Sequence, residues 1–229
     1  MAKKKLVVLS GAGISAESGL KTFRDGDGLW ENYRPEEVAS PEAWAQDPGR
    51  VLRFYNERRA QVLAAVPNAA HIGLAALEAY YEVIIVTQNI DDLHERAGSK
   101  HVLHLHGEIL KMKSERPSDW LQEIRGAIHL GDRAPDGAQL RPHVVWFGEA
   151  VPQMEAAIPH METADVFILV GSSLAVYPAA NLIDFVAEEV PKYLVDPAIP
   201  PISYGRNFYR IEQKATVGIP YLVELLSKA

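Results

Sequence analysis

Residues 6–30 read LVVLSGAGISAESGLKTFRDGDGLW, and they hold the strongest indication of the fold class. Leu6 to Leu9 is the short apolar run that a strand buried in a parallel sheet typically uses. Two glycines follow at once, and residues 14–20 are predicted to form a helix. The spacing Gly-x-Gly-x-x-Ala over residues 11–16 fits a turn that binds a dinucleotide at a helix N-terminus. Taken alone, the same glycines also fit an ordinary tight turn.

The segment that follows is unusual for a dinucleotide-binding unit. Such a unit normally continues into a second strand that ends in an acidic residue about 20 residues on. Residues 22–30, TFRDGDGLW, instead read as a glycine-containing loop with one arginine, Arg24. We predict that this loop covers a ligand as a lid. The alternative is a surface loop whose Phe23 and Trp30 side chains pack into the core.

The composition bounds the kind of protein. The chain has 229 residues, 48% hydrophobic and 23% charged, as expected for one large domain with or without a small insertion. A formal net charge of −7 argues against a broad nucleic-acid-binding surface. The absence of cysteine excludes disulfides and thiolate metal sites, and no apolar run is long enough to span a membrane. Since residues 1–5 lead straight into the first strand, we expect no signal peptide and a cytoplasmic location.

A predicted helix over residues 48–66 carries an arginine on its apolar face. That face shows steps of four, three, four and four residues: Val51, Tyr55, Arg58, Val62 and Val66. An arginine in such a place needs an anion, and Tyr55 lies beside Arg58 one turn earlier. The pair can therefore hold a ligand carboxylate. An internal salt bridge or a snorkelling arginine are the alternatives.

Polar residues follow the second clear strand, residues 82–87. Gln88, Asn89 and Asp91 come directly after it, where side chains at the carboxyl end of a parallel strand face the ligand crevice. Loop capping by the Asn and Asp side chains is the alternative.

The next predicted strand, residues 101–107, contains three histidines. With a period of two, His104 and His106 share one face and His101 lies on the other. His106 stands at the strand end, where a neutral imidazole can act as a general base. A metal site is disfavoured because no nearby carboxylate completes a familiar ligand spacing.

The remaining pattern alternates strands and helices around one polar insertion. Residues 108–149 form the insertion and end in an exposed-looking strand, 141–149, that can pair with an extended peptide. The other predicted elements are short helical pieces over 35–45, helices over 68–80, 93–97, 152–162, 178–189 and 221–226, and strands over 166–170, 193–195 and 208–211. This predicts an α/β fold, a Rossmann-like doubly wound parallel sheet made of residues 1–107 and 150–229, with a small subdomain at 108–149.

Five motifs in this order are far more specific than any one of them. They are GAGISAESGL-x-TFR at 11–24, TQNIDDLHERAG at 87–98, HLHGE at 104–108, PHVVWFGE at 142–149 and GSS at 171–173. Over nearly its whole length the chain resembles the sirtuins, a family of NAD-dependent protein-lysine deacylases. The pair Tyr55 and Arg58 further resembles the branch with the mitochondrial desuccinylase and the bacterial deacylases.

The resemblance implies a role for each motif residue. His106 corresponds to the catalytic base, with Asn89 and Asp91 in the nicotinamide pocket, where Asp91 would hold the carboxamide. The cofactor-binding positions would be Gly11, Ala12, Gly13, Ser15, Glu17, Phe23, Arg24, Trp30, Gln88, Asn89, Ile90, Asp91, Gly171, Ser172, Ser173, Asp196 and Ala215. The substrate-binding positions would be Tyr55, Arg58, Val145, Trp146 and Phe147, of which the first two bind the carboxylate of succinyl- or malonyl-lysine.

The chain departs from the family pattern in the small subdomain. Many sirtuins hold a zinc ion there with four cysteines, and residues 108–141 contain none, so no zinc is expected. We expect packing alone to hold this subdomain, around Trp120, Leu121, Ile124 and Leu140. Asp196 also stands where many members have Asn.

The implied function is the NAD-dependent removal of acetyl, succinyl or malonyl groups from protein lysines. The products would be nicotinamide and 2′-O-acyl-ADP-ribose, and the partners would be acylated proteins or peptides, with no nucleic acid and no membrane. Two alternatives stay open. One is an ADP-ribosyltransferase or NAD hydrolase that uses the same pocket, and the other is a non-catalytic sensor of NAD or ADP-ribose.

Overall fold

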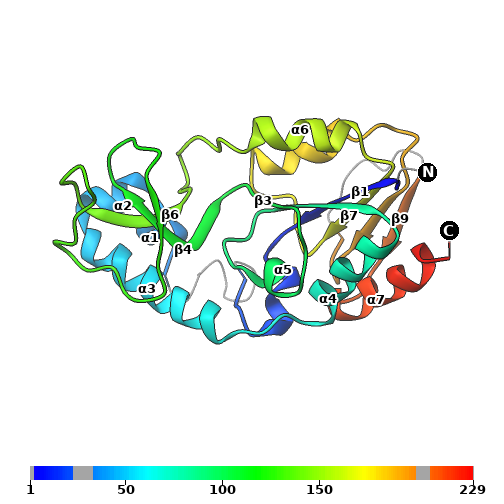
Figure 1. The fold of residues 1–229 in the computed structure, drawn as a ribbon, viewed down its shortest axis with the longest axis horizontal. Helices are drawn as coiled ribbons and strands as arrows, with labels where there is room; N and C mark the ends of the chain where they lie inside the picture. The colour runs from blue at the N-terminus through cyan, green and yellow to red at the C-terminus, as the bar shows by residue number, and fades with distance from the viewer. Residues whose placement is uncertain (1–2, 23–32, 200–206, 229) are drawn as a thin grey trace.

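The computed structural model describes residues 3–22, 33–199 and 207–228. Figure 1 shows an elongated molecule with a parallel sheet toward one end and a small antiparallel sheet at the other. The large sheet has the strand order β3-β2-β1-β7-β8-β9, and each neighbouring pair runs parallel. Its strands are β1 (Lys5–Ser10), β2 (Glu82–Thr87), β3 (Val102–His104), β7 (Val166–Val170), β8 (Lys192–Val195) and β9 (Phe208–Ile211). The predicted Rossmann-like α/β fold is confirmed.

Both faces of this sheet are covered, which explains why its central strands read as unbroken apolar runs. Alternate residues of β1 enter two different cores: Leu6 packs with α4 (Ala69–Ala76) and α7 (Ala215–Leu226), and Val7 packs with α6 (Met154–Glu162) and the 3₁₀ helix η4 (Ala179–Phe185). Figure 1 shows α6 on one side of the sheet and α4 with α7 on the other. The chain therefore crosses from face to face, as a doubly wound sheet requires.

Several predicted elements are wrong in kind or length. The expected helix over 14–20 is two short 3₁₀ turns, η1 (Ala12–Ile14) and η2 (Ala16–Ser18), and Gly19 ends the second with a φ of +88°. The expected helix over 178–189 is the 3₁₀ helix η4. The helix expected over 68–80 divides into α4 and η3 (Leu77–Ala79), whereas α7 begins six residues before the predicted start.

The strand expected over 101–107 ends at His104. Residues 105 and 106 form a turn, and Gly107 begins β4 (Gly107–Ser114) with a φ of +78°. A Cβ at Gly107 would lie 2.3 Å from the His143 carbonyl oxygen, so only glycine fits this bend. The change of direction at Gly107 sends the chain from the large sheet into the small one.

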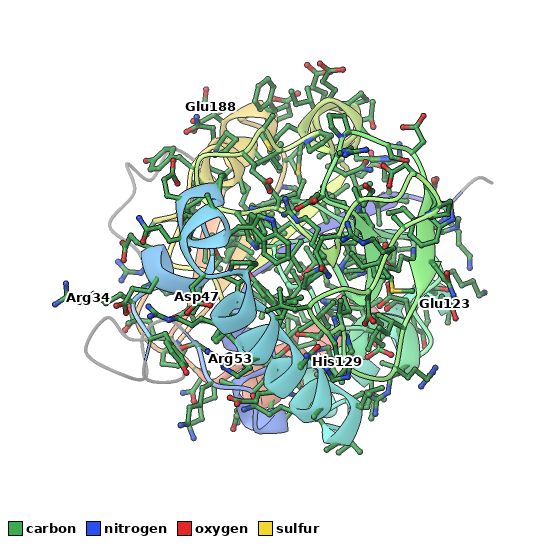
Figure 2. The ribbon with its side chains drawn as sticks, turned by 90° about the vertical axis from the view of Figure 1, so that its left-hand side faces the viewer. Arg34, Asp47, Arg53, Glu123, His129 and Glu188 are labelled. Carbon is green, nitrogen blue, oxygen red and sulfur yellow. The ribbon has the colours of Figure 1, made fainter. Side chains whose placement is uncertain are left out.

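The small sheet is antiparallel, with the order β5-β4-β6, where β5 is Leu121–Glu123 and β6 is Leu140–Val144. The strand expected over 141–149 thus stops at Val144. Helices α1 (Pro35–Val38), α2 (Pro41–Gln46) and α3 (Pro48–Ala64) lie at the same end of the molecule, where Figure 2 shows Arg53 on α3. The subdomain boundary at residues 108–149 stays a prediction. The small sheet also packs with α1, α2 and α3, which come earlier in the chain.

An apolar cluster fills the space between α3 and the small sheet. Its buried members are Leu52, Ile128, Ala134 and Leu140, with Trp44, Met112, Trp120 and Ile124 partly buried against them. Leu121 is instead 44% exposed, which corrects its place in the expected core. It lies on β5, at the edge of the sheet, where all three residues face solvent.

Among the residues that the structure describes, no single helix is long and apolar enough to cross a membrane. Within the same described ranges, one bent pair, Pro48–Ala64 and Ala69–Ala79, reaches such a length and apolarity together.

Candidate active site

The site begins where the turns after β1 and β7 touch. The Gly13 N–H donates to the Gly171 carbonyl oxygen at 2.8 Å, and the Gly11 N–H donates to that of Val170 at 3.0 Å. A Cβ at Gly13 would lie 2.7 Å from the Gly171 Cα, and Gly171 itself has a φ of +63°. The two turns therefore need glycine to approach this closely.

The loop after β2 joins these turns through side chains. The Gln88 amide donates to the Ser172 hydroxyl at 3.0 Å, and the Asn89 amide donates to the Ser15 hydroxyl at 3.1 Å. The Ser15 hydroxyl in turn donates to an Asp91 carboxylate oxygen at 3.0 Å. The structure thus brings together the three segments at the carboxyl ends of β1, β2 and β7.

Asp91 is a buried carboxylate, 5% exposed. Its burial raises its pKa, whereas hydrogen bonds from the Leu93 N–H and the Ser15 hydroxyl, and the charges of His104 and Arg58, act in the opposite direction. The Arg58 guanidinium is therefore close enough to act electrostatically on the same pocket, although it comes from α3. Asp91 can accept hydrogen bonds from a bound amide when it is ionised.

His106 lies in the turn between β3 and β4. Its Nδ1 is 3.0 Å from the Gln88 carbonyl oxygen, and because a carbonyl only accepts, Nδ1 carries the proton. Burial lowers the pKa of His106, so the neutral form is favoured and Nε2 holds a lone pair. This is the protonation state that a general base needs.

Tyr55 and Arg58 lie on consecutive turns of α3, as the spacing predicts. Tyr55 is fully buried against the Phe54 ring, and burial raises the pKa of its hydroxyl. Arg58 is 7% exposed and donates to the Lys21 carbonyl oxygen at 3.1 Å and to the Gln61 side chain at 3.2 Å. Both of these acceptors are neutral amide oxygens.

The stretch 145–147 runs beside the His106 turn. The Val145 N–H donates to the His106 carbonyl oxygen, the Trp146 N–H to Glu149, and the Phe147 N–H to the Ala39 carbonyl oxygen. A substrate backbone that pairs with this stretch must therefore donate to its carbonyl groups. Trp146 is buried with the Arg141 guanidinium carbon 3.3 Å from its ring centre, and Phe147 is 44% exposed.

Two of the predicted cofactor positions, Glu17 and Asp196, have structural partners. Glu17 accepts from the Thr216 hydroxyl at 2.6 Å and pairs with Lys214 at 3.7 Å, which fixes the start of α7 next to η2. The carboxylate of Asp196 accepts from the Ala198 N–H at 2.8 Å.

The other predicted positions fall as follows. Ile90 is half-buried, and its carbonyl accepts from the Ile109 N–H. Ala12 lies in η1, Ser173 follows Ser172 in the turn after β7, and Ala215 is the buried first residue of α7. Phe23, Arg24 and Trp30 lie outside the described residues.

The sequence did not point to a buried layer of polar side chains beneath the site. Ser10 donates to the Thr87 hydroxyl at 2.8 Å and lies 2.9 Å from His94 Nε2, and the Thr87 oxygen also accepts from the Asn89 N–H. The His94 and His71 rings meet edge to face at 5.0 Å, and burial lowers the pKa of His71 to about 4. His94, in the motif TQNIDDLHERAG, was the sequence signal that could have pointed to this layer, because it follows closely after the crevice loop.

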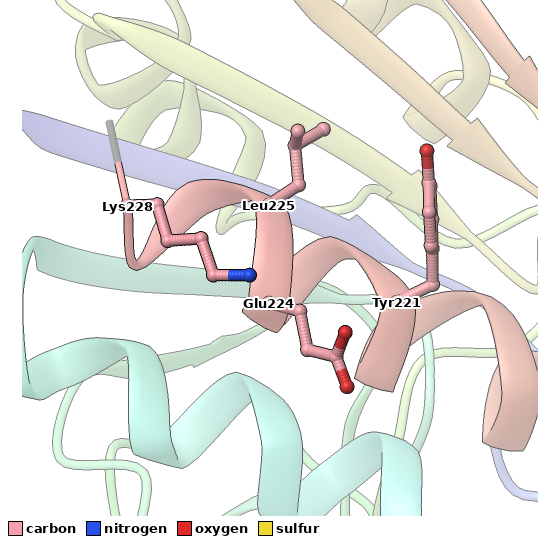
Figure 3. A pocket seen from close by; sticks show the side chains of 4 residues that line it. All are labelled: Tyr221, Glu224, Leu225 and Lys228. Atoms are coloured by element: carbon pink, nitrogen blue, oxygen red, sulfur yellow. The ribbon is translucent and has the colours of Figure 1, made fainter.

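Within residues 3–22, 33–199 and 207–228, no three or more His, Cys, Asp or Glu side chains are grouped to hold a metal ion. The hollow in Figure 3 lies on α7 and is lined by Tyr221, Glu224, Leu225 and Lys228, none of which belongs to the site above.

Comparisons with known proteins agree with this geometry. The sequence pattern of the Sir2 family matches residues 11–178. The chain is 47% identical to an NAD-dependent protein deacylase of Bacteroides thetaiotaomicron over 99% of both chains. It is 49% identical to one of Helicobacter pylori strain 26695 over 98% of this chain and all of the relative.

Solved structures give the same result. A mutant Sir2 homologue in complex with ADP-ribose has a TM-score of 0.90 at 40% identity, covering 99% of this chain and 93% of that one. A Sir2 homolog–NAD complex has a TM-score of 0.88 at 40% identity, with coverages of 99% and 90%. A Sir2 variant with a deacetylated p53 peptide and 3′-O-acetyl ADP-ribose has a TM-score of 0.82 at 29% identity, with coverages of 97% and 94%. This chain, as its motifs predict, belongs to the Sir2 family.

Proposed function

We propose that this chain is an NAD-dependent protein deacylase that removes acyl groups from lysine side chains, acidic acyl groups included. One observation carries the proposal: the loop after β2 joins the buried Asp91 carboxylate, bonded to Ser15 of the glycine turn, to the His106 imidazole, bonded to the Gln88 carbonyl oxygen. The similarity to NAD-dependent protein deacylases supports the activity. The cytoplasmic location, and the absence of nucleic-acid and membrane partners, stay predictions.

The donor set fits NAD. Asn89 and Asp91 are each more than nine-tenths buried and are held by Ser15, which places an amide and a carboxylate where a nicotinamide carboxamide can pair with both. The glycine turns after β1 and β7 lie at the carboxyl ends of their strands, where phosphates and ribose bind in parallel sheets of this kind. When bound, NAD supplies the activated ribose carbon that accepts the acyl oxygen and releases nicotinamide.

His106 is the residue that moves a proton. Its Nδ1–H is fixed on the Gln88 carbonyl oxygen, so Nε2 accepts a proton from a ribose hydroxyl. The fixed tautomer and the lowered pKa keep this nitrogen ready near neutral pH. ADP-ribosyl transfer and NAD hydrolysis form no acyl intermediate. They therefore do not need His106 to accept the ribose hydroxyl proton.

Arg58 and Tyr55 account for the acidic acyl groups. A guanidinium binds a carboxylate far better than a methyl group, so its charge favours succinyl- and malonyl-lysine over acetyl-lysine. The electrostatic effect of Arg58 on the pKa of Asp91 supports a place for Arg58 at the inner end of the acyl site. Burial holds the Tyr55 hydroxyl in its neutral form, in which it can donate to the same carboxylate.

The proposal is tested with acetyl-, succinyl- and malonyl-lysine peptides of one sequence, each with and without NAD. Nicotinamide release and acyl-ADP-ribose are measured by mass spectrometry. We expect both products only when peptide and NAD are present together. Nicotinamide release that is equal without peptide would indicate NAD hydrolysis, ADP-ribose on protein would indicate the transferase, and no release at all would indicate a sensor.

A further inference from the structure

Two histidines hold consecutive carbonyl groups of the crevice loop. His106 Nδ1 contacts the Gln88 carbonyl oxygen at 3.0 Å, and His104 Nδ1 contacts the Asn89 carbonyl oxygen at 2.8 Å. His104 is 9% exposed and comes from the end of β3. The proposed reaction uses His106, and it gives no task to His104.

The second ring nitrogen of His104 faces a carboxylate. His104 Nε2 lies 2.7 Å from a Glu95 oxygen, and Glu95 stands on α5 (Leu93–Arg96). A carbonyl and a carboxylate are both acceptors, so both ring nitrogens must carry a proton to satisfy them. His104 is therefore an imidazolium paired with Glu95, two residues away from a neutral His106.

We propose that the Glu95–His104 ion pair is a positioning device that fixes the Asn89 backbone, so that the Asn89 amide and the Asp91 carboxylate face nicotinamide. The inference rests on the proposed function, since that function gives Asn89 and Asp91 their ligand. Asn89 is then held at three points: its N–H by Thr87, its carbonyl by His104 and its side chain by Ser15. Glu95 and His104 touch no substrate and act through this loop.

The charges around His104 agree with an imidazolium. Glu95 and, more weakly, Glu108 raise the pKa of His104 against the effect of burial, and the Asn89 carbonyl adds to the rise. His104 in turn lowers the pKa of its two other titratable neighbours, Asp91 and His94. The imidazolium thus favours the ionised form of Asp91.

The ion pair exists only within a pH window. The pKa of Glu95 is lowered, so its contribution is lost as pH falls through that value, and the pKa of His104 is raised, so its contribution is lost as pH rises through it. His106, whose pKa is lowered, becomes neutral on the acid side. We expect His106 to set the acid limb of the pH profile for NAD, and His104 the alkaline limb.

The decisive variant is Glu95→Gln, which keeps the shape of the side chain and removes its charge. We expect the alkaline limb of kcat/KM for NAD to move down by roughly one pH unit or more. The KM for NAD and the inhibition constant for nicotinamide should rise about three- to tenfold at neutral pH, while the KM for the acyl peptide stays within about twofold. Glu78→Gln is the matched control, because Glu78 forms an ion pair with Lys100 away from the site.

A second measurement does not depend on activity. Nitrogen-15 NMR of histidine rings, assigned with His104→Gln, should show both His104 nitrogens protonated at neutral pH in the wild type and a lower pKa in Glu95→Gln. A His104 that is neutral at pH 7, or a Glu95→Gln profile equal to that of the wild type, would overturn the proposal. If the wild type releases no nicotinamide but His104 is charged, the proposed function fails and the ion pair stands.

Discussion

The Ser15 hydroxyl donates to the buried Asp91 carboxylate across 3.0 Å, and this bond joins the glycine turn after β1 to the loop after β2. Ser15 is 2% exposed and also accepts from the Asn89 amide. One small side chain therefore orders both residues of the proposed nicotinamide pocket. The two segments are separated by 76 residues in the sequence, so the parallel pairing of β1 with β2 is what brings them together.

Replacing Ser15 with Ala removes this link. A hydrogen bond to a charged group is worth about 1.5–3 kcal/mol, so kcat/KM for NAD should fall roughly 10- to 100-fold. The pKa of Asp91 should rise further, because the bond to its charged form is lost. Steady-state kinetics over pH 6–9 measures both effects. Ser118→Ala changes an exposed serine of the small subdomain. This control should leave kcat/KM for NAD and its pH dependence unchanged.

His106→Ala should abolish deacylation while NAD binding is retained. In the proposed reaction the imidazole moves a proton, whereas we expect Asn89, Asp91 and the glycine turns to hold NAD. Calorimetric titration with NAD should give a Kd within about threefold of the wild-type value, and product formation should drop by about 10²–10⁴-fold. Undiminished turnover would contradict the role of His106. His101→Ala, on the same segment but outside the crevice, is the matched control.

Arg58→Met should separate the two acyl classes. Only a charged acyl group gains from the guanidinium, so kcat/KM for the succinyl peptide should fall about 100-fold and that for the acetyl peptide should change less than about threefold. Arg53→Met, an exposed arginine on the same helix that Figure 2 labels, controls for a general effect on α3. Equal loss of both activities would show that Arg58 acts on the fold instead of the acyl group.

The sequence predicts the elements whose signal is local. Glu82–Thr87 and Phe208–Ile211 form strands with the predicted bounds, because an apolar run between turn residues specifies a buried strand. The predicted helix after the glycine turn is wrong because the close approach of Gly13 to Gly171 shapes the turn from a distant segment. Leu121 is apolar but exposed, because an edge strand has no layer above it.

The candidate site was predicted in its parts more readily than in its connections. Motif positions named Ser15, Asn89 and Asp91, yet nothing in the spacing shows that one serine joins the other two. His104 and Glu95 lie nine residues apart, across a strand boundary, so their contact depends on the path of the chain between α5 and β3. Tertiary hydrogen bonds of this kind follow from the fold and have no local pattern.

Arg59 is the residue whose loss should most weaken the small subdomain. It is 1% exposed, its Nε donates to the Ile109 carbonyl oxygen of β4 at 2.9 Å, and its Nη1 donates to the Gly126 carbonyl oxygen at 3.2 Å and to Asn56 at 2.8 Å. The bond to Ile109 connects α3 to β4, and the bond to Gly126 connects α3 to the segment after β5, in a chain that contains no cysteine.

Arg59→Met should therefore lower the free energy of unfolding by about 2–4 kcal/mol, since two backbone carbonyls lose a charged donor. Urea unfolding of the variant measures this loss, with Arg53→Met as the exposed control on the same helix. We expect packing and these hydrogen bonds to hold the small subdomain without a zinc ion. A metal chelator should therefore leave the unfolding midpoint of the wild type unchanged. A midpoint that falls with chelator would show that a metal shares in the stability that we assign to Arg59.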